Sequence, residues 1–294
     1  MKVFIDIETI PGQRLELRKE IAAQLSDVPP YEDPKCPRNI KKAETIRDWQ
    51  ENTFPQLREA AQQKYQDDLV KRESALEDAW RKTALHGEQG EIICIGWAIE
   101  DSEPSVCFRH QYESEAVLLQ TFFNAAYEQL NKRNPSWVGH NVQFDLRFLF
   151  HRAVILNVKP LINLYQDSKP WSELAQDTMV LWAGVKERIS LDRLCKVLGI
   201  PTKDADLPNG EVIDGSKVWD FVQRGEVEKV ATYCMGDVIR CREIYKRINF
   251  VDAIAPNLKG SAKIDQKSDV PPSELTGNSS QPELSMSPPE HVSP

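Results

Sequence analysis

Two acidic residues stand two positions apart in an otherwise apolar segment at the start of the chain. Residues 2–9 read Lys-Val-Phe-Ile-Asp-Ile-Glu-Thr, and this composition predicts a buried β-strand. Since side chains alternate along a strand, Asp6 and Glu8 are expected on one face. Two carboxylates on a buried face repel each other and resist desolvation, and a bound divalent cation relieves both costs. The alternative is an edge strand with one solvated face, on which both acids are simply hydrated.

Two later segments add acids at helices. Residues 139–145 read Gly-His-Asn-Val-Gln-Phe-Asp, which predicts a tight turn leading into a helix with Asp145 near its start. Residues 233–237 read Tyr-Cys-Met-Gly-Asp, and the spacing of four places Tyr233 and Asp237 on one helix face. Each pattern also has an ordinary explanation, because the helix dipole favours acids in a first turn and Tyr–Asp pairs occur on helix surfaces.

Together, the three segments resemble the motifs of the DEDD superfamily of 3′–5′ exonucleases, in the branch whose third motif is Tyr-x-x-x-Asp. Residues 6–8, 141–145 and 233–237 occur in the order of that family's first, second and third motifs. The sequence around the first two motifs is most similar to that of stand-alone relatives of the proofreading exonuclease domain of family B DNA polymerases. The resemblance spans about residues 1–11 and 90–248.

The resemblance implies an RNase H-like fold and phosphodiester hydrolysis by two metal ions about 3.5–4 Å apart. It implies that Asp6 bridges both ions, that Glu8 and Asp237 hold the ion that activates water, and that Asp145 supports the second ion. These four acids are therefore both the catalytic and the metal-binding candidates. An all-oxygen ligand set suits Mg²⁺ or Mn²⁺.

The remaining site residues are also implied by the resemblance. Tyr233 is the fifth catalytic candidate; because an ordinary tyrosine pKa lies near ~10, we expect it to orient the attacking water rather than act as a base. The substrate-binding candidates are Thr9, His140, Asn141 and Phe144. Asn141 fits a turn residue equally well. Asp177, in an Asp-Thr pair typical of the family, is expected to be structural or to cap a helix.

The elements that must position these residues follow from periodicity. Strands are predicted at residues 2–9, 91–99, 106–110 and 137–140. Helices are predicted at residues 14–25, 43–50, 54–85, 113–133, 144–156, 192–198 and 218–223, with a helix or helix pair at 226–247. The fold class is α/β, an RNase H-like mixed sheet flanked by helices. We expect one domain over residues 1–250 and a disordered tail over 251–294, which is rich in proline and serine.

The first strand is followed by a helical insertion over residues 13–88, which the resemblance does not explain. Residues 35–82 hold eleven lysines and arginines against nine acids, so the insertion is close to neutral. One interpretation is an arm over the active-site cleft that guides single-stranded substrate or binds a partner. The other, which mixed charge favours, is a solvated helical hairpin that packs an apolar stripe, including Leu57, Leu69 and Trp80, onto the core.

Composition limits the class of protein. The net charge is −8, which is unusual for a nucleic-acid binder, but residues 251–294 contribute −3 of it and a metal-using enzyme needs carboxylates. No run of about 18 apolar residues and no signal peptide is present, so we expect a cytoplasmic protein without membrane contact. The six cysteines form no CxxC pair and are expected to be free thiols in a reducing compartment.

The function expected from the sequence is a metal-dependent 3′–5′ exonuclease with a role in DNA repair. Its substrate would be single-stranded DNA or frayed 3′ ends, and its products 5′-mononucleotides. The alternatives are an exoribonuclease, because discrimination depends on contacts to the 2′-hydroxyl, and a catalytically silent nucleic-acid-binding module. The partners are single-stranded DNA or RNA, and a protein partner could use the insertion or the tail.

Overall fold

The computed structural model describes residues 1–110, 114–164, 172–202, 211 and 213–251. Residues Met1–Ala253 form one compact unit. The tail predicted to be disordered lies, apart from its first residue, outside the described residues. Within the described ranges, no helix has the length and apolar character needed to cross a membrane. All six cysteines are free thiols, as predicted.

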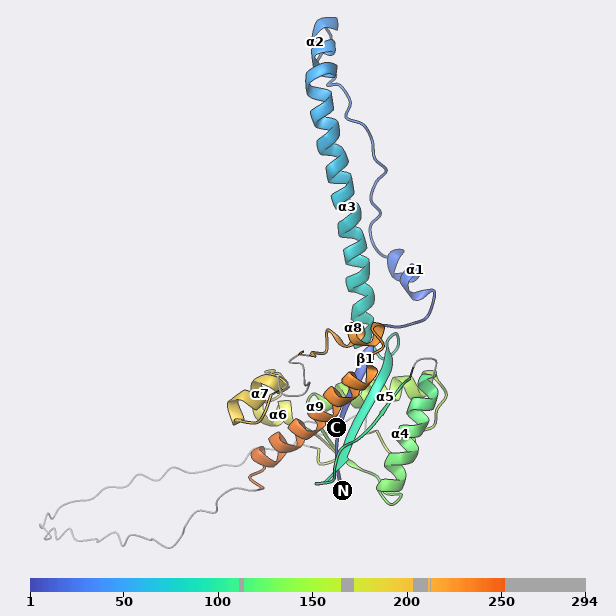
Figure 1. Ribbon diagram of the computed structural model, residues 1–294, viewed down its shortest axis with the longest axis vertical. Coiled ribbons are helices and arrows are strands. Elements are labelled where there is room, and N and C mark those ends of the chain that lie inside the picture. The colour runs from blue at the N-terminus through green and yellow to red at the C-terminus, as the bar shows by residue number, and fades with distance from the viewer. Residues whose placement is uncertain (111–113, 165–171, 203–210, 212, 252–294) are drawn as a thin grey trace, which may run out of the picture. The chain divides into compact units, whose positions relative to one another are not determined.

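A five-stranded mixed sheet forms the centre of the fold (Figure 1), in the order β3-β2-β1-β4-β5. Its strands are β1 (Lys2–Ile10), β2 (Glu91–Ile99), β3 (Ser105–Phe108), β4 (Ser136–Gly139) and β5 (Ala175–Asp177). β1 pairs antiparallel with β2 and parallel with β4, so it is the central strand. The α/β prediction is confirmed, and the edge-strand alternative for the first acidic segment is wrong. β5, which is only three residues long, was not predicted.

Helices cover both faces of this sheet. They are α4 (Glu115–Gln129), α5 (Val142–Ile155), α6 (Thr178–Ala183), α7 (Leu191–Leu198), α8 (Val218–Gln223) and α9 (Val227–Ile248). Ile5 and Ile7 of β1 belong to a core cluster shared with α4 and α5, for example through Phe122 and Leu146. On the opposite face, Phe4 packs with residues of α9. Residues 227–248 form a single helix rather than a pair.

The insertion is helical, as predicted. It contains α1 (Leu17–Ala22), α2 (Ala43–Asp48), a π-helical turn (Trp49–Thr53), α3 (Phe54–Lys82) and a 3-10 turn (Thr83–Leu85). Residues with high helix propensity fill α3, and Pro55 occupies its first turn, where proline is tolerated. The start and the end of the insertion meet at Gly12. A Cβ there would lie 2.1 Å from the carbonyl oxygen of Gln89, so this close approach requires glycine.

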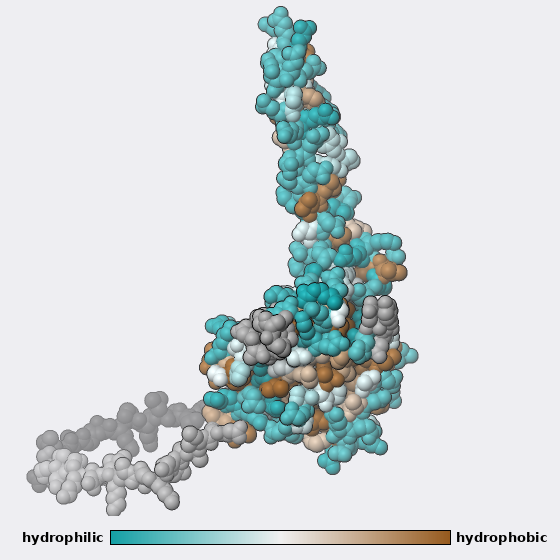
Figure 2. All heavy atoms as spheres, in the orientation of Figure 1, coloured by the Kyte–Doolittle hydropathy of each residue, from teal (hydrophilic) through white to brown (hydrophobic). Residues whose placement is uncertain are grey.

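Only the end of α3 that precedes β2 is packed against the unit's core. The indole N–H of Trp80 donates to the carbonyl oxygen of Gly12 at 3.0 Å, and the Arg18 guanidinium lies 4.0 Å from the Trp80 ring. Leu57 and Leu69 are 44% and 38% exposed. Figure 2 shows hydrophilic residues over most of the visible surface of this helix. The prediction that the whole apolar stripe packs onto the core is therefore wrong. Within the described residues, Tyr65 of the stripe instead contacts Tyr31 of the segment before α2, with ring centroids 5.9 Å apart.

Candidate active site

β1 places Asp6 and Glu8 on one face, at the centre of the sheet. Asp6 lies opposite Gly96 of β2, and Glu8 lies opposite Cys94. Glu8 is buried and Asp6 is half-buried. The apolar residues that alternate with them hold the strand in the core, and as a result two carboxylates are fixed where water is scarce.

A glycine in β2 brings α9 close to these acids. A Cβ at Gly96 would lie 2.9 Å from the sulfur of Cys234 and 3.2 Å from a methyl group of Val238. With only a hydrogen atom at Gly96, α9 can approach the sheet closely enough for Cys234 Sγ to donate to the carbonyl oxygen of Asp6 at 3.4 Å. α9 therefore carries the third acidic segment directly onto β1.

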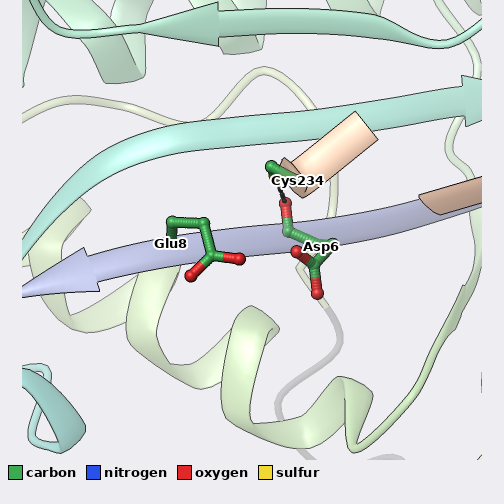
Figure 3. A group of neighbouring side chains, drawn as sticks. All are labelled: Asp6, Glu8 and Cys234. Carbon is green, nitrogen blue, oxygen red and sulfur yellow. Dashed lines mark hydrogen bonds between the residues drawn. The ribbon is translucent and has the colours of Figure 1, made fainter. Parts of the chain in front are cut away.

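The thiol of Cys234 belongs to the acidic cluster, which the sequence did not indicate. The ligand atoms of Asp6, Glu8 and Cys234 all lie within 4.8 Å of one another. Figure 3 shows these three neighbouring side chains, with a dashed line between Cys234 and Asp6. Burial, reinforced by neighbouring groups that include Cys94, raises the pKa of the Cys234 thiol well above its usual value. The thiol therefore stays protonated as a hydrogen-bond donor. This group of three contains neither Asp145 nor Asp237.

Asp145 lies against the same strand from the side of α5. Its carboxylate oxygen Oδ1 accepts a hydrogen bond from the backbone N–H of Ile7 at 3.2 Å, and its side chain is buried. Burial and the charge of Asp6 raise the pKa of Asp145 well above its usual value. Asp145 and Asp6 are thus close enough to repel each other, which is the electrostatic situation that a cation between them relieves.

Tyr233 and Asp237 face the cluster from α9. Tyr233 is 4% exposed. Burial raises the pKa of Tyr233 far above its usual value, and the charges of Glu8, Asp237 and Asp6 and a hydrogen bond to Asp237 add to the effect. The phenol therefore stays protonated across the physiological pH range. The predicted spacing of four residues does bring Tyr233 and Asp237 together.

Arg240 is the main residue that the sequence reasoning missed. Its Nη1 lies 2.9 Å from Oδ1 of Asp237, and both side chains are 6% exposed. Its Nε donates to the carbonyl oxygen of Pro201 at 3.2 Å. The spacing of three residues on a helix was a signal for this pair. Arg240 compensates part of the negative charge that the acids accumulate.

The second acidic segment forms the turn that was predicted. Asn141 has φ +68°, in the left-handed region that asparagine tolerates, and it precedes α5. Its backbone N–H donates to Oδ1 of Asp177 at 2.9 Å, and Oδ1 also caps α6 by accepting from the N–H of Met179. The prediction that Asp177 caps a helix is confirmed. Asn141 has at least the structural role that its turn geometry indicates.

The other substrate-binding candidates lie in different environments. The ring nitrogens of His140 lie 3.0 Å from the Thr178 hydroxyl and 2.8 Å from the carbonyl oxygen of Ile189, so both already have protein contacts. The hydroxyl of Thr9 donates to the carbonyl oxygen of Ala84 at 2.7 Å and so ties β1 to the insertion. The half-buried Phe144 lines a cavity of about 180 Å³. Phe144 and Thr9 are thus the two candidates whose residues line a cavity.

A comparison with protein families gives one match. Residues 91–266 match a family described as "Predicted 3'-5' exonuclease related to the exonuclease domain of PolB". The matched residues are 176 of 294, or about 60% of the chain. They include the second and third acidic segments, whereas Asp6, Glu8 and the insertion lie outside the match.

Comparison with solved structures gives the family B DNA polymerase from the hyperthermophilic archaeon Pyrobaculum calidifontis. The sequence identity is 19%, and the TM-score is 0.41. The match covers 55% of this chain and 22% of the polymerase chain, so it spans about a fifth of that protein. No curated protein matches the chain.

Proposed function

The chain belongs to the family of predicted 3′–5′ exonucleases related to the exonuclease domain of PolB, and from this premise we propose that it is a metal-dependent 3′–5′ exonuclease. Its substrate is single-stranded DNA or a frayed 3′ end, and its products are 5′-mononucleotides. The exonuclease domain spans residues 1–250 and includes the insertion. The motif pattern is that of the Tyr-x-x-x-Asp branch of the DEDD superfamily.

The accumulation of negative charge at β1 supports this proposal most directly. Burial is the main cause of the raised pKa values of Asp145 on α5 and Tyr233 on α9. The charge of Asp6 adds to both shifts, and the charges of Glu8 and Asp237 add to that of Tyr233. Three elements that are far apart in the sequence therefore bring acids within electrostatic reach of one another. Clustered carboxylates lower the stability of a protein when no cation compensates their charge, so a purely structural role does not explain them.

The donor set fits Mg²⁺ or Mn²⁺. Asp6, Glu8, Asp145 and Asp237 offer only carboxylate oxygens, and the protonated thiol of Cys234 adds no thiolate that would favour zinc. Arg240 contacts Oδ1 of Asp237, and a carboxylate has two oxygens with several lone pairs, so this contact does not by itself prevent Asp237 from serving as a metal ligand. Bound divalent ions would supply Lewis-acid stabilisation of charge on the phosphate and a nucleophile at neutral pH.

The protein's own residues then orient the reactants. The protonated Tyr233, whose hydroxyl donates to Asp237, accepts a hydrogen bond from the attacking water and holds it in line with the scissile phosphate. The water oxygen forms a bond to phosphorus, and the bond from phosphorus to the 3′-oxygen of the preceding nucleotide breaks. The water loses one proton and the 3′-oxygen takes one up, so the step balances, and the released nucleotide keeps the phosphate on its 5′ carbon. Phe144 provides an aromatic surface for the terminal base.

Labelled oligonucleotides test the proposal. DNA and RNA strands, each labelled at either end, are incubated with Mg²⁺, Mn²⁺ or EDTA. We expect metal-dependent shortening of the 5′-labelled DNA and immediate release of a 3′-terminal label as a mononucleotide. Asp192→Asn, at a half-buried acid that pairs with the exposed Lys196 four residues later, is a control for loss of an acid elsewhere. Faster cleavage of RNA would identify an exoribonuclease, and binding without cleavage would identify a silent module.

A further inference from the structure

A second cavity lies where β1 meets the end of the insertion. Its volume is about 650 Å³. It is lined by Thr9 of β1, by Pro11 directly after that strand, by Arg81, Lys82 and Leu85 at the end of the insertion, and by Trp219 of α8. Thr9 directly follows Glu8, and consecutive Cα atoms are only about 3.8 Å apart. One residue that lines the cavity is therefore the immediate neighbour on β1 of an acid of the cluster. Its walls from residues 9–85 lie outside the family match.

Direct contacts hold the walls of this cavity in place. Arg81 bridges α3 and α8, with Nη2 at 2.8 Å from Oδ1 of Asp220, and its Nε donates to Glu77 at 2.8 Å. Figure 1 shows α8 beside the end of α3 that precedes β2. The third wall is β1, and the hydrogen bond from Thr9 to the carbonyl oxygen of Ala84 ties it to the turn that follows α3. The cavity is thus a preformed site rather than a gap between mobile segments.

Trp219 gives the cavity an aromatic wall. Its ring packs edge-to-face against Trp80, with centroids 5.3 Å apart and planes at 80°. Trp80 is itself fixed by its hydrogen bond to Gly12. Trp219 is only half-buried, so part of its surface is open. A rigid, partly exposed indole is the kind of surface on which a nucleobase stacks.

Lys82 supplies positive charge at the edge of the cavity. Two carboxylates already compensate Arg81, whereas within the described part of the chain no ion pair involves the exposed Lys82. Asp78 also lines the cavity and partly offsets the positive charge. The volume falls within the range of about 300–1,000 Å³ typical of small-molecule sites. An apolar, aromatic cavity with cations at one side matches a base and its phosphate.

The same turn that closes this cavity also borders the smaller cavity beside Phe144. Leu85 lines both. If the terminal base lies against Phe144, as proposed above, the strand that is retained after cleavage must leave the acidic cluster along a different surface. The larger cavity offers such a surface, because it shares Leu85 with the smaller cavity and is lined by Thr9, the neighbour of Glu8 on β1.

We propose that this cavity binds the base of the penultimate nucleotide of the substrate strand, stacked on Trp219, with Lys82 near an adjacent phosphate. The inference rests on the proposed function, because it assumes a nucleic-acid strand at the acidic cluster. It assigns to the insertion the role of completing the substrate site. It also places two substrate-positioning residues outside the acidic motifs.

Binding measured in EDTA tests this site without requiring cleavage. The dissociation constant is measured by fluorescence anisotropy for a normal single strand and for strands that lack the base at the penultimate or the third position from the 3′ end. We expect Trp219→Leu to weaken binding of the normal strand about tenfold, within the range for loss of one base stack. Loss of the penultimate base should weaken wild-type binding equally.

Combining Trp219→Leu with removal of the penultimate base tests whether the indole and that base contact each other. Trp219→Leu should bind the strand without the penultimate base no more weakly than wild type does, because both changes remove one contact. Equal weakening of all strands by Trp219→Leu, or an effect confined to the third base, would overturn the assignment. Trp182→Leu, at a partly exposed tryptophan on α6, controls for loss of a surface indole.

Lys82→Gln keeps the test decisive if Trp219→Leu fails to fold, because Lys82 is exposed. Removing one phosphate contact should reduce the slope of log Kd against log salt by about one. Lys64→Gln, at an exposed lysine in the middle of α3, should leave the slope unchanged. Equal slopes for Lys82→Gln and Lys64→Gln would overturn the phosphate contact. Failure of wild type to cleave any strand would refute the proposed function while leaving these binding results interpretable.

Discussion

The guanidinium of Arg240 lies 2.9 Å from the carboxylate of Asp237, three residues away on α9, and both side chains are almost fully buried. A buried ion pair of this kind is costly to break from one side, because the remaining charge has no compensation. Here the remaining charge would add to those of Asp6 and Glu8. Arg240 is therefore expected to stabilise the protein when no metal is bound.

We predict that Arg240→Gln lowers the free energy of unfolding in EDTA by about 3–5 kcal/mol, the usual cost of breaking a buried pair. Added Mn²⁺ should restore more stability to Arg240→Gln than to wild type, because the cation compensates Asp237. Thermal melting with and without Mn²⁺ measures both effects. Arg193→Gln, at an exposed arginine, is the control. A Mn²⁺-induced gain in melting temperature equal to that of wild type would contradict this role.

Asp6→Asn should abolish turnover without lowering stability in EDTA. Asp6 raises the pKa of the buried Asp145, so the two groups repel each other when no cation is present. Replacement by the isosteric, neutral amide removes that repulsion. The melting temperature in EDTA should be equal to or higher than that of wild type. A lower melting temperature in EDTA would show that Asp6 serves the fold instead.

Tyr233→Phe should lower kcat and kcat/KM together by about 10²–10⁴-fold, because a group that orients the nucleophile acts in the transition state. Substrate Kd should stay nearly unchanged. Since the phenol pKa is raised far above its usual value, no ionisation of Tyr233 should affect the rate between about pH 6 and 9. Single-turnover cleavage over that range measures both quantities. An unchanged cleavage rate would make Tyr233 a packing residue.

Gly96→Ala tests the close approach of α9 to the sheet. The new methyl group would lie 2.9 Å from Cys234 Sγ, so α9 must shift. We expect a loss of stability of about 1–3 kcal/mol, as for other overpacked cores, together with reduced turnover. Cys234→Ala should partly rescue both in the Gly96→Ala background. Gly215→Ala, with no atom near its new Cβ, is the control for stability. Additive effects of the two substitutions would disprove the contact.

The predictions from sequence were most accurate for elements whose pattern of apolar and charged residues is compatible with only one position in the fold. The apolar run around Asp6 and Glu8 required a central strand, and β1 is central. The bounds of β2 were predicted without error, since a long apolar run ends there in charged residues. The helical spacing of Tyr233 and Asp237 correctly placed both on one side of α9. The roles of these residues in catalysis stay predictions.

The features that were missed depend on tertiary contacts. Cys234 lies at the acidic cluster because Gly96 admits α9, and neither residue indicates the other in the sequence. The spacing of three residues indicated Arg240 as a partner of Asp237, but the burial of the pair is visible only in the structure. The apolar residues of α3 have helical spacing, but spacing does not reveal whether anything covers them, and Leu57 is exposed. A three-residue strand such as β5 is too short to show a period.

The products released from a single-stranded DNA test the central claim most directly. A strand with a fluorophore at its 5′ end is incubated with Mg²⁺ and either wild type or Asp6→Asn, and the early products are identified by mass. The account predicts unlabelled 5′-nucleoside monophosphates and a labelled strand that shortens one nucleotide at a time with wild type, and no release with Asp6→Asn. A labelled mononucleotide as the first product, or undiminished release by Asp6→Asn, would contradict it.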